Sequence, residues 1–199
     1  MTIRHNTKFR KTIQRMKPAS TDDIRKVLSL CESHPDLQIP GYVTRVIANT
    51  GLRNCELMCL RVSDIESDEG WLHIGHPRGM HVGNRVLPLR PKTLSALLSL
   101  HRLNPQSEFV FGDSPRTRFD QTIRKLRTVA PQFMHTRLWT YSIRLNFSSR
   151  LLSAGIHSGI AKYCLGYRSK GDPFGALPLT HEQRLQVIRR YIERFLEEL

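Results

Sequence analysis

The sequence predicts a mostly helical α+β domain with a small antiparallel β-sheet at one edge. Apolar residues recur at steps of three and four along much of the 199-residue chain, which is the period of amphipathic helices. Two short runs rich in strand-forming residues, Trp71–Ile74 and Arg85–Leu89, flank a glycine-rich stretch that fits the turn of a hairpin. A composition with 39% hydrophobic and 24% charged residues is that of an ordinary globular domain.

The helices expected before the hairpin have clear start and stop signals. Ser20 or Thr21 would cap a helix that opens with the acidic turn of DDIRKVLSLCESH. The run Gly41–Thr50 predicts a buried helix that Gly51 ends, and Arg53–Leu60 predicts the start of another.

The elements expected after the hairpin are also mainly helical. Pro91 fits the first position of a helix with the apolar stripe of KTLSALLSLHRL. Phe109–Phe111 is a candidate for one more short strand, and Thr117–Val129 has the period of a helix. The stretch Thr180–Leu199 predicts a strongly amphipathic helix with a Thr-x-x-Gln capping box.

The stretch Trp139–Gly166 is expected to form a pair of helices that delivers Tyr167. Tyr141 and Arg144 are three residues apart and would share one face of the first helix. The opposite side would be buried through Ile143, Phe147, Leu151 and Ala154. A cationic side chain and two phenols held by rigid helices point to an anion site.

The charge balance points to a polyanionic partner. Lys+Arg number 31 against 17 Asp+Glu, which gives a formal net charge of +14. Such an excess repels itself, and it is expected where the partner is nucleic acid or an anionic membrane surface. The basic residues are not confined to one amphipathic helix, and the apolar runs are too short to span a bilayer. We therefore expect a cytoplasmic, nucleoid-associated protein that binds nucleic acid and no membrane.

The first 17 residues contain no acidic side chain. Their basic residues are Arg4, Lys8, Arg10, Lys11, Arg15 and Lys17. A solvated tail is one interpretation, and an arm that follows phosphates is the one we favour, with the arm at residues 1–19 and a single domain at 20–199. A second set of candidate DNA contacts points outward from the helix expected at 117–129: Arg118, Arg124, Lys125 and Arg127.

The four cysteines and nine histidines show no metal-binding spacing. The chain has no Cys-x-x-Cys pair and no His-Glu-x-x-His motif. Cys55 and Cys59 lie at helical spacing in an apolar run, so we expect reduced core residues rather than metal ligands. We expect no metal and no other cofactor.

Four segments, in order, resemble the tyrosine recombinases, also called phage integrases. TGLRNCELMCLRVSDI (Thr50–Ile65) is similar to the family's first signature, in which Gly-Leu-Arg-x-x-Glu-Leu precedes Leu-Arg and a Ser/Asp pair. RVLPL (Arg85–Leu89), YSIRLNF (Tyr141–Phe147) and LGY (Leu165–Tyr167) then follow in the family's order. The resemblance covers residues 20–199, nearly a whole family catalytic domain, and implies that fold. Residues 1–19 are too few for the DNA-clamping domain that often precedes it.

The resemblance implies roles for five residues. Arg53 and Arg144 would be the two catalytic arginines, and Glu56 would brace Arg53. Two guanidiniums can clamp the oxygens of one scissile phosphate and stabilise the charge that builds in the transition state. Tyr141 stands where the family usually has histidine, and Tyr167 where it has a second histidine or tryptophan. Both phenols can donate a hydrogen bond to a phosphate. Surface salt bridges are the alternative for the two arginines.

The proton donor and the nucleophile depart from the family pattern. The hairpin lysine that protonates the leaving 5′ oxygen has no clear counterpart: Met80 aligns there, with Arg78 and His81 as weak substitutes. The usual window for the nucleophilic tyrosine contains none, and the next one is Tyr191. Either an insertion at Lys170–Leu179 displaces the nucleophile to that position, or Tyr191 is an ordinary packed tyrosine.

Three functions remain open on the sequence. The first is site-specific DNA recombination or integration through a 3′-phosphotyrosyl intermediate, without a metal because the covalent link preserves the bond energy. It implies self-assembly on DNA as a dimer or tetramer, with Ile192–Leu199 as a candidate docking segment. The second is a catalytically degenerate integrase-like DNA-binding regulator or accessory factor that cleaves no strand. The third is a small RNA-binding protein of the ribosomal type.

Overall fold

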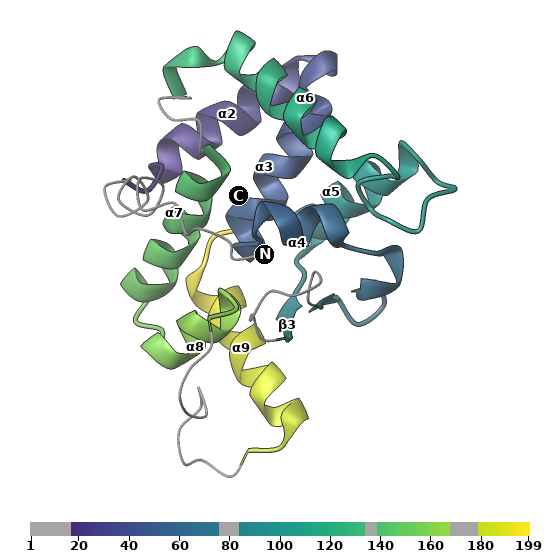
Figure 1. Ribbon diagram of the computed structural model, residues 1–199. Helices are drawn as coiled ribbons and strands as arrows, with labels where there is room; N and C mark the ends of the chain where they lie inside the picture. The colour runs from purple at the N-terminus through teal and green to yellow at the C-terminus, as the bar shows by residue number, and fades with distance from the viewer. Residues whose placement is uncertain (1–16, 76–83, 134–138, 168–178) are drawn as a thin grey trace, which may run out of the picture.

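The structure is a computed structural model that describes residues 17–75, 84–133, 139–167 and 179–199. Helices predominate, and a small sheet lies at one edge, so the expected fold class is confirmed (Figure 1). The α-helices are α2 (Thr21–Ser33), α3 (Gln38–Thr50), α4 (Asn54–Cys59), α5 (Pro91–Arg102), α6 (Pro115–Val129), α7 (Trp139–Ser153), α8 (Ser158–Cys164) and α9 (His181–Phe195). Short 3-10 turns lie at Pro35–Leu37, Val62–Asp64 and Pro131–Phe133.

The sheet is a three-stranded antiparallel meander within the described residues. Its strands are β1 (Ile65–Glu66), β2 (Trp71–Ile74) and β3 (Arg85–Pro88), in the order β1-β2-β3. The register pairs Trp71 with Pro88 and Ile74 with Arg85, which confirms the predicted hairpin. The strand expected at Phe109–Phe111 is wrong. Phe109 forms only an isolated bridge with Arg61, because the chain turns at Val110–Phe111 and both side chains enter the core.

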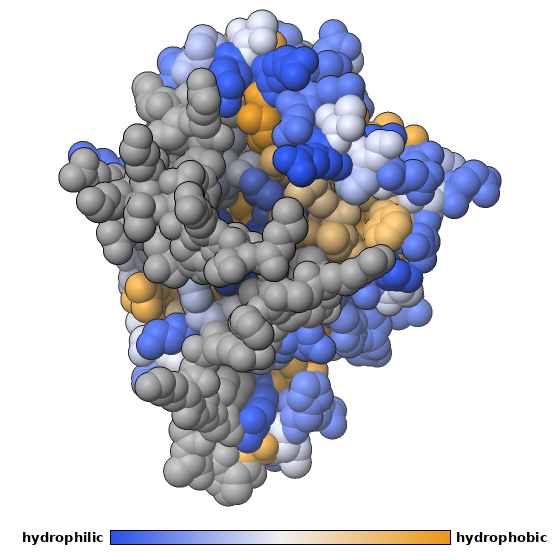
Figure 2. All heavy atoms as spheres, in the orientation of Figure 1, coloured by the Kyte–Doolittle hydropathy of each residue, from blue (hydrophilic) through white to orange (hydrophobic). Residues whose placement is uncertain are grey.

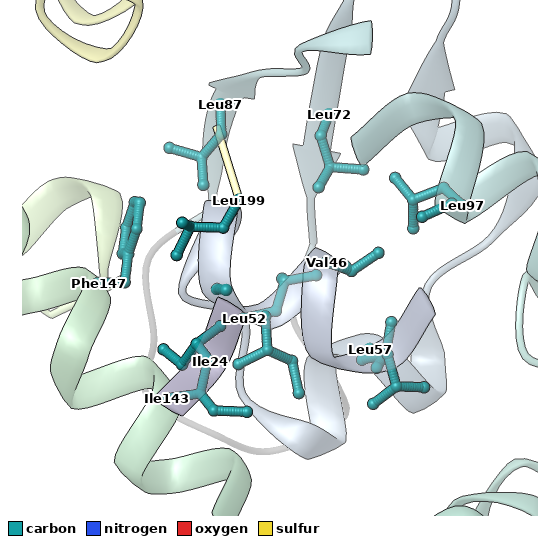
Figure 3. Packing of buried hydrophobic residues seen from close by; sticks show 14 of the residues in the cluster. Ile24, Val46, Leu52, Leu57, Leu72, Leu87, Leu97, Ile143, Phe147 and Leu199 are labelled. Atoms are coloured by element: carbon teal, nitrogen blue, oxygen red, sulfur yellow. The ribbon is translucent and has the colours of Figure 1, made fainter. Parts of the chain in front are cut away.

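Helix α3 lies at the centre of the molecule and packs against α2, α5 and α7. Most of its side chains are buried because neighbours cover it on several sides. Figure 3 shows side chains from distant parts of the chain meeting in the core, among them Val46 of α3, Leu87 of β3 and Phe147 of α7. The apolar area buried here is the main favourable term for folding, and it fixes the elements that carry the site.

Gly51 connects this centre to the site. It ends α3 in the left-handed conformation, with φ +62°, and its N–H donates to the Ile47 carbonyl oxygen at 2.9 Å. A Cβ at this position would lie 2.4 Å from Cδ1 of Phe147, so only glycine lets the chain pass this close to α7. The chain then enters α4 at Arg53.

The last residues of the chain pack onto the chain's own core. The Thr180–Gln183 capping box is present, but α9 ends at Phe195 instead of continuing to Leu199. Leu196 and Leu199 are buried, and the side-chain amide of Asn49 exchanges two hydrogen bonds with the Leu199 backbone, at 2.8 and 3.0 Å. In the segment expected to dock on a neighbour, Ile192, Leu196 and Leu199 are therefore buried inside this chain, and Figure 3 shows Leu199 near Leu87.

Candidate active site

Arg53 is held at the start of α4 by the carboxylate of Glu56. Its backbone N–H donates to Glu56 Oε2 at 2.7 Å and its Nη1 donates to Oε1 at 2.9 Å. Its Nη2 lies 3.4 Å from the carbonyl oxygen of Gly166, and its side chain keeps 23% exposure. Glu56 therefore fixes the backbone and the guanidinium of Arg53 together, while one edge of the guanidinium stays open to solvent.

Arg144 approaches the same place from α7. Its guanidinium donates to the carbonyl oxygens of Gly51 and Leu165, so it joins the end of α3 to the end of α8. The residue is only 4% exposed, whereas the sequence placed it on the face away from the core. The reason is that α3 and α8 both pack against α7. Burial, followed by the charge of Arg53, lowers the pKa of Arg144 to about 10, so it stays protonated at neutral pH.

The two arginines meet at Tyr167. Gly166, with φ +66°, turns the chain out of α8, and Tyr167 is 48% exposed. The Cζ atoms of Arg53 and Arg144 lie 5.4 and 5.6 Å from its ring centroid. Tyr141 belongs to the same group: burial and Tyr167 raise the pKa of its phenol, and the charges of Arg144 and Arg53 offset part of that rise. Two guanidiniums and two phenols are thus brought together from α4, α7 and the end of α8.

Arg85 is a member of this cluster that the sequence analysis assigned only to a strand. It is 3% exposed, and its two Nη atoms donate to the two oxygens of Glu56, each at 2.9 Å. Its Nε donates to the Cys164 carbonyl oxygen at 2.8 Å. Burial by itself raises the pKa of Glu56, but the hydrogen bonds and charges of Arg85 and Arg53 outweigh it and hold that pKa below its usual value. The signal available in the sequence was a charged residue in the otherwise apolar run RVLPL.

The other predicted catalytic residues lie outside the described residues or on α9. Arg78, Met80 and His81 fall in the undescribed range 76–83. Tyr191 lies in the middle of α9, where its half-buried side chain packs against the core near the buried Ile188.

Some of the predicted DNA contacts lie outside the described residues, and the others differ in their exposure. Arg4, Lys8, Arg10, Lys11 and Arg15 lie outside the described residues, and Lys17 is exposed. Arg124, Lys125 and Arg127 are exposed on α6, over which Figure 2 shows mostly hydrophilic residues. Arg118 is half-buried, with its guanidinium packed against Gly112, so it does not share their outward position.

The cysteines follow the expectation only in part. Cys31 and Cys164 are buried, and burial raises the pKa of their thiols to about 11 and about 12. Cys55 is half-buried and Cys59 is exposed, so the core assignment is wrong for Cys59. The reason is that α4 has only six residues and ends at Cys59. In the ranges that the structure covers, no group of three or more His, Cys, Asp or Glu is placed to hold a metal ion.

The site and the fold together define a domain of the kind found in tyrosine recombinases. The model of the phage integrase family matches residues 19–172, and the chain belongs to this family. No sequence match was found among curated proteins.

Solved structures share the fold. The integrase of transposon Tn1549 in complex with transposon right end DNA superposes with a TM-score of 0.62 at 16% identity, over 90% of this chain and 66% of that one. XerA recombinase gives 0.60 at 18% identity over 88% and 65%, and the integrase of mycobacterium phage Brujita gives 0.60 at 17% over 92% and 64%. This chain thus spans less than two thirds of each of these proteins. Among the described residues, no helix combines the length and the apolar character needed to cross a membrane.

Proposed function

We propose that this chain binds duplex DNA and acts in site-specific recombination or integration, cleaving and rejoining a strand through a 3′-phosphotyrosyl intermediate. The observation that carries the proposal is the convergence of the Arg53 and Arg144 guanidiniums on the Tyr167 ring, at 5.4 and 5.6 Å. Such a pair suits the non-bridging oxygens of one phosphodiester. Family membership, the net charge of +14 and the DNA-bound Tn1549 integrase support it.

Tyr191 is the proposed nucleophile. Its hydroxyl oxygen attacks the scissile phosphorus, a Tyr–O–P bond forms and the bond from phosphorus to the 5′ oxygen breaks. The phenol gives up its proton, and the leaving 5′ oxygen takes one up. His81 or Arg78 is the proposed donor of that second proton. Attack by a 5′ hydroxyl on the phosphotyrosine reverses these steps and rejoins the strand.

The four clustered side chains would act on the phosphate itself. Arg53 and Arg144 stabilise the negative charge that grows on its non-bridging oxygens. Because burial raises the pKa of Tyr141, its phenol is protonated at neutral pH and serves as a hydrogen-bond donor rather than as a base. The hydroxyl group of Tyr167, a residue that is 48% exposed, would donate to the same phosphate.

The wider DNA contact would come from the basic residues. Residues 1–19 are proposed as an arm that follows phosphates and residues 20–199 as the catalytic domain. Strand exchange requires more than one copy, so we include self-assembly on DNA in the proposal. The exposed basic residues of α6 would extend the contact beyond the scissile phosphate.

Covalent capture tests the proposed mechanism. The chain is incubated with a pool of nicked duplexes of randomised sequence, and adducts that survive denaturation are isolated and sequenced. We expect an adduct with the wild type and with Tyr42→Phe, a control at another partly buried tyrosine, and none with Tyr191→Phe. The mechanism fails if no adduct forms, or if Tyr191→Phe forms it equally well.

A second candidate is a DNA-binding regulator that cleaves no strand. The observations that favour it are the packing of Tyr191 against the core and the use of two Arg144 hydrogen bonds on backbone carbonyls. This function predicts duplex binding with a steep salt dependence and no covalent adduct at any sequence. The capture experiment therefore separates the two candidates.

A further inference from the structure

A hollow lies beside the arginine cluster, between α4, α6 and the start of α7. Its volume is about 380 Å³, and it is lined by Asn54, Phe119, Asp120, Ile123, Arg124, Arg127, Trp139 and Thr140. Asn54 directly follows Arg53, and Thr140 directly precedes Tyr141. Because neighbouring Cα atoms are about 3.8 Å apart, the hollow and the arginine cluster are built on the same stretches of backbone.

The hollow has a net positive lining. Arg124 and Arg127 lie three residues apart on α6 and face it together with Asp120, the one acidic residue among the described residues of the lining. Both arginines are exposed, and within the described ranges neither forms an ion pair. Lys125 is also exposed but does not line the hollow, because it lies about 100° around the helix from Arg124. The free guanidiniums can therefore take an anion from outside.

Trp139 is a lining residue that also carries an unpaired donor. The residue is 5% exposed, and its indole nitrogen is buried with no hydrogen-bond partner among the residues that the structure describes. A buried N–H in a native protein nearly always has a partner, so such an atom marks a place where an acceptor is missing. Phe119, at 6% exposure, adds an apolar surface but no open ring face on which a base could stack.

We infer that this hollow binds the phosphodiester group next to the scissile one on the same DNA strand. Arg124 and Arg127 hold the phosphate, and the attached sugar lies against the apolar wall. The volume is within the range of sites for small ligands and is large enough for a phosphate with its sugar. The inference rests on the proposed binding of duplex DNA and adds a defined second contact to it.

Tryptophan fluorescence reports directly on the hollow. The chain has two tryptophans, so Trp71→Phe leaves Trp139 as the single emitter. In that background, a generic duplex is titrated into Arg124→Gln/Arg127→Gln and into Lys125→Gln, which removes a charge from the same helix outside the hollow. We expect the duplex to change Trp139 emission in the parent and in Lys125→Gln, and to leave it unchanged in the double variant.

Salt dependence gives an independent reading in the unaltered background. Each phosphate contact contributes about 0.9 to the slope of log K against log salt, so the double variant, which loses one phosphate contact, is expected to lose about 0.9. An unchanged slope, or a Trp139 response that persists in the double variant, overturns the second contact while duplex binding and the proposed function stand. No duplex binding by the wild type overturns both. If Trp71→Phe does not fold, the salt slope alone decides.

Discussion

Replacing Arg85 with methionine is expected to destabilise the fold by about 3–5 kcal/mol, because it leaves a buried carboxylate with only half of its partners. The side chains of Arg85 and Glu56 are each 1% exposed and share two charge-assisted hydrogen bonds of 2.9 Å. A third bond, from Nε to the Cys164 carbonyl oxygen, is lost as well. A domain is stable by only about 5–15 kcal/mol, so this is a large share of the total.

Urea unfolding followed by circular dichroism measures the effect. With a slope of about 2–3 kcal/mol/M, the midpoint is expected to fall by about 1–2.5 M. Glu56→Leu alone leaves Arg85 without its ionic partner and is expected to cost a similar amount. Glu56→Leu/Arg85→Met removes both charges and is expected to cost less than the two single losses together, although the Arg53 bonds to Glu56 are still lost. The reasoning is refuted if Arg85→Met shifts the midpoint by less than about 0.3 M, or if the two single losses simply add.

Three further predictions concern the carboxylate of Glu56, the thiols of Cys59 and Cys164, and the backbone at Gly51. The pKa of Glu56 is lowered in the folded state. The contribution of its carboxylate to stability is therefore present above the unfolded pKa and is lost as pH falls through the folded pKa. Thermal melting at decreasing pH should accordingly show a smaller loss of stability in Glu56→Gln than in the wild type. Cys59 is exposed and should react with iodoacetamide in the native protein. Cys164 should react only on unfolding, because burial raises the pKa of its thiol to about 12. Mass spectrometry of the labelled peptides checks both expectations. Gly51→Ala should reduce the free energy of unfolding by more than the roughly 1–2 kcal/mol cost of a left-handed alanine, because its Cβ would also meet Phe147. The melting temperature should fall accordingly, and an unchanged melting temperature would contradict that.

The elements with local signals were predicted well because those signals act over a few residues. The Ser20 hydroxyl caps α2 by accepting from the Asp23 N–H at 3.0 Å, and Thr180 and Gln183 form the expected box before α9. Gly51 ends α3 where a left-handed cap was needed. Each of these features depends on residues within one helical turn of each other.

The parts that were not predicted depend on residues far apart in the chain. Arg85 pairs with a carboxylate 29 residues away, and the apolar run RVLPL around it does not indicate which partner it has. Arg144 has the spacing of an exposed face, yet α3 and α8 close over it. The inward turn at Leu196 likewise depends on Asn49, across nearly the whole chain, through its bonds to the Leu199 backbone. The sequence could therefore name candidates for the site, but not the network that positions them.

That network explains how the site keeps its positive charge. Arg53, Arg85 and Arg144 surround one buried carboxylate, so Glu56 can offset only part of their charge. Because Arg85 occupies both oxygens of Glu56, that carboxylate is shared, and Arg53 is positioned without being fully neutralised. The lowered pKa of Arg144 shows that burial and the neighbouring charge disfavour its protonated form. An arriving anion relieves that repulsion, so interactions that are unfavourable in the empty site become favourable as negative charge develops on a bound phosphate.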